Sequence, residues 1–201
     1  MLTEKKEGWL CETSLTDGST VRFFLQTWQV EDFCHRFDFV FDGKGAANRL
    51  ERIGTLMAAD VELHGLPFAN YMAADNFFQQ YLSSDHSSNQ PLREMARCLY
   101  RNADGTEAES IDCTDAELMG VFLWFCFVKD NFSKAFPHLF KPAANATSYD
   151  PRAAMDAQIR ALTGGDITKE RLIEESDVWR ALTELDAKAR EAEELNKKLK
   201  Q

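Results

Sequence analysis

The feature that most constrains the fold is an unbroken apolar segment, Leu118–Val128, which directly follows a helix-start signal. Residues 114–117 read Thr-Asp-Ala-Glu, a capping box in which the threonine side chain accepts from a free N–H and the glutamate reaches back to the threonine amide. A helix that is apolar on all sides is buried on all sides. With Pro137 and Pro142 as terminators, the sequence predicts a central core helix over residues 114–136, wrapped by the other elements.

The N-terminal region is typical of a β-hairpin. Two β-rich runs within residues 8–28 flank Asp17-Gly18, and this pair favours a tight turn because glycine adopts positive φ without steric cost. A two-stranded ribbon is marginally stable alone, so we expect it to pack on the helices. Residues 30–41 fit two patterns, a helical stripe, which we favour, and an alternation of phenylalanines that suits a strand.

Most of the remaining sequence has apolar residues at helical spacings of three and four. Glycine, proline and short polar stretches separate these segments. Between two of them lies an acidic stretch, residues 102–113, which we expect to be an exposed loop. The predicted helices span about residues 46–64, 68–82, 90–101, 151–162 and 167–200, the last with a break near Ser176.

The predicted fold class is mainly α. It comprises a helical core domain with an N-terminal β-hairpin over residues 1–140, a small and polar linker over 141–150, and a C-terminal helical arm over 151–201. Pairs of an acidic residue with a basic residue four positions later, such as Glu184–Lys188, stabilise the helix of the arm by roughly 0.2–0.5 kcal/mol each. Its narrow apolar seam is then free for a partner, and the predicted helix-in-groove contacts are Trp179, Leu182, Leu185 and Leu195.

The charge and composition of the chain limit the classes of partner that it can bind and indicate its cellular compartment. The net charge of −10 disfavours nucleic acids and membrane surfaces, because phosphates and anionic lipids attract lysine and arginine. The longest uncharged run has 11 residues, fewer than the roughly 20 that span a membrane. No secretory signal precedes Leu10, and the five cysteines contain no C-x-x-C pair, so we interpret them as reduced thiols of a cytoplasmic protein.

The sequence contains no recognisable catalytic or metal-binding motif. Cys34 and His35 have ligand chemistry, but adjacent residues on a helix point about 100° apart and would not easily share a metal. The acidic residues between Glu107 and Glu117 do not have the spacing of an EF-hand loop. Phosphate loops and dinucleotide-binding glycine patterns are also absent from the sequence. We therefore expect no catalytic residue, no metal and no cofactor.

Four stretches carry a family resemblance: Ala96–Arg101, Ala161–Glu170, Val178–Leu182 and Ala187–Glu194. They resemble tail-region proteins of bacteriophages and prophages, the small proteins made alongside the tape-measure protein. The resemblance implies a non-enzymatic role in tail assembly in a bacterial host cytoplasm, as a chaperone with a long helical tape-measure-like partner. It leaves the β-hairpin and residues 20–41 unexplained, and it carries over no catalytic residue.

These observations lead to one main hypothesis and two alternatives. The main hypothesis is a non-enzymatic protein-binding assembly factor or chaperone. The first alternative is a small-molecule-binding or enzymatic helical domain, with an aromatic pocket among Phe33, Phe37, Trp124 and Phe125. The second is a structural subunit of a particle that oligomerises through the C-terminal helix.

Overall fold

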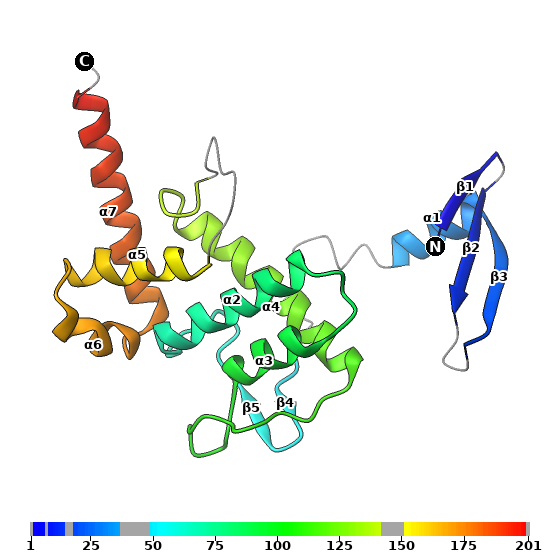
Figure 1. Cartoon of the computed structure of the whole chain (residues 1–201), viewed down its shortest axis with the longest axis horizontal. Helices are drawn as coiled ribbons and strands as arrows, with labels where there is room; N and C mark the ends of the chain where they lie inside the picture. The colour runs from blue at the N-terminus through cyan, green and yellow to red at the C-terminus, as the bar shows by residue number, and fades with distance from the viewer. Residues whose placement is uncertain (1, 7, 15–17, 37–48, 142–150, 200–201) are drawn as a thin grey trace. The chain divides into compact units, whose positions relative to one another are not determined.

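The computed structural model describes residues 2–6, 8–14, 18–36, 49–141 and 151–199 (Figure 1). The chain divides into two compact units, Met1–Lys44 and Gly45–Gln201. The described residues are mainly helical, with an antiparallel sheet at the N-terminus, which confirms the predicted fold class. The boundary between the units falls within the predicted first domain, and the predicted linker lies outside the described residues from residue 142 on.

The first unit is a three-stranded antiparallel sheet with one helix. Its strands β1 (Leu2–Lys5), β2 (Gly8–Ser14) and β3 (Thr20–Gln26) lie in the order β1-β2-β3. The hairpin of β2 and β3 confirms the prediction, whereas β1 is an additional strand. Helix α1 (Thr27–Arg36) contacts β2 and β3, which confirms the helical interpretation as far as residue 36. Residues 37–41 lie outside the described residues.

The second unit begins with a hairpin where a helix over residues 46–64 was predicted. Strands β4 (Arg52–Ile53) and β5 (Leu56–Ala58) pair around a two-residue turn, and β6 (Tyr100–Arg101) pairs with β5. Gly54, the first turn residue, has a φ of 58°, and hairpin turns of type II′ take glycine there. Ile53 pairs directly with Leu56 across the turn. An i,i+3 apolar spacing therefore arises from this hairpin as well as from a helix. Residues 46–48 lie outside the described residues.

The other elements that the structure describes in the second unit are helical. The break near Ser176 agrees with the prediction. No helix within the described ranges combines the length and apolar character needed to cross a membrane. The elements are α2 (Phe68–Ser83), α3 (Gln90–Leu99), α4 (Asp115–Ala135), α5 (Pro151–Thr163), the 3-10 turn η3 (Ile167–Lys169), α6 (Glu170–Glu174) and α7 (Val178–Leu199).

Helix α4 starts with the predicted capping box. The Glu117 amide donates to Thr114 Oγ1 at 3.3 Å, and the Thr114 amide donates to Glu117 Oε2 at 2.8 Å. The prediction that this helix is enclosed on every side was wrong, because Met119 is 42% exposed and other residues of that face are half-buried. Within the described residues, the neighbouring elements bury one face fully and leave the rest of the helix half-buried or exposed. That face consists of Leu118, Val121, Trp124, Phe125, Val128 and Phe132.

Candidate protein-binding surface

Helix α7 has two halves with different surroundings. In the first half, Leu182 is 0% and Leu185 is 4% exposed, and both belong to the core of the second unit. In the second half, Leu195 is 58% and Leu199 is 75% exposed. Figure 1 shows this second half extending past α5 and away from the other helices of the unit. The predicted contact residues on α7 therefore do not share one surface.

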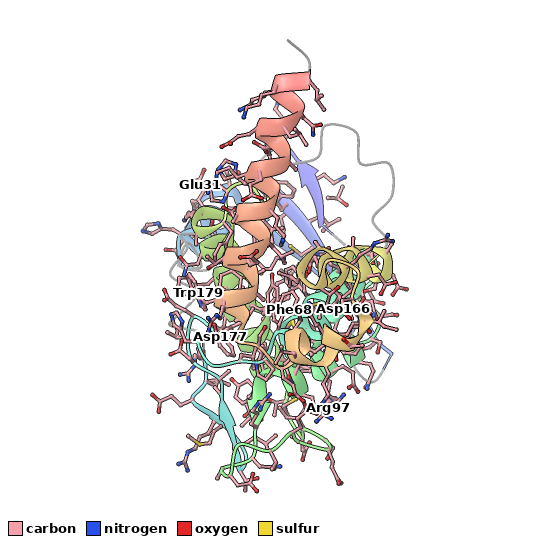
Figure 2. The ribbon with its side chains drawn as sticks, turned by 90° about the vertical axis from the view of Figure 1, so that its left-hand side faces the viewer. Glu31, Phe68, Arg97, Asp166, Asp177 and Trp179 are labelled. Carbon is pink, nitrogen blue, oxygen red and sulfur yellow. The ribbon has the colours of Figure 1, made fainter. Side chains whose placement is uncertain are left out.

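The first turn of α7 is fixed to the loop that precedes α2. The Phe68 amide donates to the Ser176 carbonyl at 2.8 Å, and the Val178 amide donates to the Leu66 carbonyl at 3.0 Å. The Asp177 carboxylate accepts from a further amide of the same loop at 2.6 Å. Figure 2 shows Asp177 beside Phe68 at this end of the helix. These bonds attach the beginning of α7, within the predicted arm, to the core.

Trp179 is held by contacts within its own unit. Its indole N–H donates to the Glu62 carbonyl at 2.7 Å, and its ring stacks on His64 with 4.7 Å between ring centroids. The rings of Phe132 and Phe136 each lie 5.3 Å from it. Trp179, together with the two buried leucines, therefore holds α7 to its core. Three of the four predicted contact residues thus make contacts within their own unit, and Leu195 alone among the four lies on the projecting half.

The middle of α7 is fixed by the turn that follows α4. Asp186 Oδ1 accepts from the backbone amides of His138 and Leu139 at 2.8 and 2.9 Å. Further along, Glu193 accepts from Lys141 Nζ at 3.0 Å, and this bond holds the pKa of the Glu193 carboxyl below its ordinary value. The last turns, residues 194–199, extend beyond these contacts.

An open groove lies between α5, α6 and the first half of α7. It has a volume of about 920 Å³. Leu172, on α6, is 69% exposed at the groove, whereas Ile167, which is 76% exposed, lines a separate hollow beside α5. An exposed large apolar side chain in an open groove is a candidate binding contact. The residues lining the groove are Leu162, Leu172, Ile173, Glu175, Ser176, Arg180, Ala181, Thr183 and Glu184.

Sequence reasoning missed the groove, although the sequence holds one signal for it. Leu172 and Ile173 are adjacent large apolar residues on a short helix that is otherwise charged. Ile173 packs against the core, and Leu172 faces outward. The core thus takes up only one of the two apolar neighbours, and the other lies at the groove.

Of the four residues predicted to line an aromatic pocket, two have side chains that the structure describes, and both are packed in the core. Trp124 and Phe125 are both 0% exposed. The Trp124 ring meets Tyr100 edge-on, with 6.2 Å between centroids, and Phe125 lies 5.3 Å from Phe78. The structure describes neither Phe37 nor the side chain of Phe33. The two described rings are part of the core rather than the walls of an opening.

Three cysteines of the second unit have the properties of core residues. Cys98 is 7% exposed, and burial raises the pKa of its thiol to about 11. Burial also raises the pKa of Cys113 and of Cys126. These thiols stay protonated at neutral pH, whereas a nucleophilic cysteine reacts as the thiolate. Among the described residues, no group of three or more His, Cys, Asp or Glu is placed to hold a metal ion.

The geometry thus offers an open apolar groove beside a helix whose last turns project from the core. Both features belong to the second unit, and both involve α7. No protein-family model, curated protein or solved structure matches the chain, so the functional argument rests on these residues themselves.

Proposed function

We propose that this chain is a non-enzymatic protein-binding assembly factor or chaperone that holds an amphipathic helix of its partner in the groove between α5, α6 and α7. The observation that carries the proposal is the exposed apolar floor of the groove, above all Leu172. A helix that docks in a groove presents apolar residues at i, i+3, i+4 and i+7. A volume of about 920 Å³ accommodates several such side chains at once.

The charges around the groove indicate the kind of helix. Its lining includes the carboxylates of Glu175 and Glu184 and one guanidinium, that of Arg180. The whole chain also has a net charge of −10. Complementary potentials guide encounter and register, so a helix with lysine or arginine beside its apolar stripe fits better than an acidic one.

The openness of the groove favours a protein partner over a small ligand. Small-molecule sites generally bury most of the ligand surface. Here Leu172 is 69% exposed, so a small ligand above it would remain in contact with water. An extended helix can cover this residue and continue beyond the groove. The exposed Leu195 and Leu199 offer it further apolar contacts on α7.

The resemblance to phage tail-region proteins makes tail assembly the first process in which to test the proposal. In tail assembly the partner is a long helical tape-measure-like protein. Two of the stretches that carry the resemblance, Ala161–Glu170 and Val178–Leu182, contribute residues to the groove. We propose that the chain keeps apolar faces of such a partner covered until assembly.

A designed peptide tests the groove directly. The probe is an 18-residue helix with leucine at i, i+3, i+4 and i+7, lysine at positions beside this stripe and alanine at the other positions. We expect Leu172→Glu to weaken its binding by about tenfold or more, because the substitution puts a charge into the apolar contact. Fluorescence anisotropy of the labelled peptide measures the dissociation constant.

Two controls separate the groove from general charge attraction. Leu82 on α2 is 49% exposed and does not line the groove, so Leu82→Glu adds the same charge elsewhere and should change the affinity less than about twofold. A peptide with glutamate in place of lysine should bind more weakly than the lysine peptide. Equal affinities for the two protein variants would refute the proposed site.

A further inference from the structure

The sheet of the first unit has two outer edges, and the edge formed by β3 is the more accessible. β3 has seven residues, and six of them are exposed. Among these are Val21, Phe23 and Phe24, which are 39%, 44% and 47% exposed. Within the described residues no strand pairs with its outer side. An edge strand that is long and apolar is a template for pairing with another strand.

The two edges of this sheet differ in protection. β1 has only four residues, and two of them, Glu4 and Lys5, are charged. Short length and charge are common devices that keep an edge strand from pairing. β3 contains no proline and only one charged residue, Arg22, which forms an ion pair with Glu12 of β2 at 3.0 Å. The sequence therefore protects one edge and leaves the other open.

We propose that β3 pairs with β3 of a second copy of this chain, antiparallel and with Phe23 on the twofold axis. Such an interface is isologous, because each copy contributes the same residues. With Phe23 opposite its own counterpart, Val21 lies opposite Leu25, and Arg22 lies opposite Phe24 of the other copy. The two three-stranded sheets become one sheet of six strands. This inference goes beyond the groove of the second unit and does not depend on it.

The side-chain pattern of β3 fits a second copy. Val21, Phe23 and Leu25 share one face, because side chains alternate along a strand. In the pairing proposed, this face carries an aromatic pair on the axis, with a valine–leucine pair on either side. On the other face the guanidinium of Arg22 lies opposite an aromatic ring, a favourable cation–π neighbour. No like charges lie directly opposite each other, so the strand is complementary to itself in this register.

Substitutions that place opposite charges at Phe23, on the proposed axis, test the pairing in the full-length chain. Sedimentation equilibrium over a concentration series should give a wild-type mass of twice 22.9 kDa. Phe23→Lys and Phe23→Glu should each be monomeric, because two like charges then meet on the axis. Mixing the two variants in equal amounts should restore the dimer, because a lysine then faces a glutamate.

Matched controls use Trp28, which is 62% exposed and lies in α1 just after the strand. Trp28→Lys and Trp28→Glu should both remain dimeric. Circular dichroism shows whether each variant is folded. A wild type that stays at 22.9 kDa at every concentration would overturn the proposal. So would folded Phe23 variants that stay dimeric singly, or that stay monomeric when mixed.

A measurement on the unmodified chain covers the case in which the Phe23 variants do not fold. Amide hydrogen exchange is recorded at two protein concentrations, one below and one above the dimerisation midpoint. Protection within β3 should rise with concentration, whereas protection within β1 should not. Unchanged protection of β3 would contradict the pairing.

Discussion

Replacing Trp124 with alanine is expected to lower the free energy of unfolding of the second unit by about 3–5 kcal/mol. The indole is 0% exposed, and its N–H donates to the Val61 carbonyl at 2.8 Å. The guanidinium of Arg49 lies 5.6 Å from its ring centroid. The substitution leaves a cavity and removes the donor of the Val61 carbonyl, and both effects destabilise the fold. Urea unfolding followed by circular dichroism measures the change.

Two further variants separate the causes. Trp124→Phe keeps most of the ring contacts but removes the N–H, so a loss of about 1–3 kcal/mol is expected. Met119→Ala changes an exposed residue of the same helix and should cost less than about 1 kcal/mol. If Trp124→Ala cost no more than Met119→Ala, Trp124 would not be a core residue.

The second large effect is expected for Leu182→Ala, which should cost about 2–5 kcal/mol. Leu182 is 0% exposed and belongs to the same core cluster as α4. The matched control is Leu195→Ala, the same substitution on the same helix at a residue that is 58% exposed. We expect that control to change the free energy of unfolding by less than about 0.5 kcal/mol. Thermal or urea unfolding of both variants gives the comparison.

The difference between the effects of these two substitutions on the free energy of unfolding distinguishes a helix packed into the fold from a free helix. A free arm predicts small and similar effects for both substitutions. A helix fully packed on its unit predicts large effects for both. Only the division of α7 described above predicts one large and one small effect.

Local signals in the sequence predicted the elements that depend on local chemistry. The cap at Thr114 needs only residues within one helical turn, and it forms as predicted. The break near Ser176 is also local. The hairpin at Gly54 was missed because Leu50, Ile53, Met57 and Val61 recur at helical spacings. In the hairpin Met57 instead pairs with Arg52, and Ile53 pairs with Leu56.

The site could not be predicted in the same way, because its surroundings come from distant segments. The apolar seam of α7 has one period along its whole length, but the loop around Leu66 and the turn at His138 cover only part of it. Periodicity identifies an apolar face and does not say whether the same chain or a partner covers it. The groove likewise requires α5, α6 and α7 to be placed around Leu172.

Helix α7 is divided into a packed first half and a projecting end, and residue-resolved amide hydrogen exchange tests this division most directly. We expect amides of Ala181–Leu185 to exchange as slowly as those of α4, through global opening. Amides of Glu194–Leu199 should exchange near the rate of an unfolded chain. Uniformly fast exchange along α7 would show a free arm, uniformly slow exchange would show a fully packed helix, and either result would contradict the account.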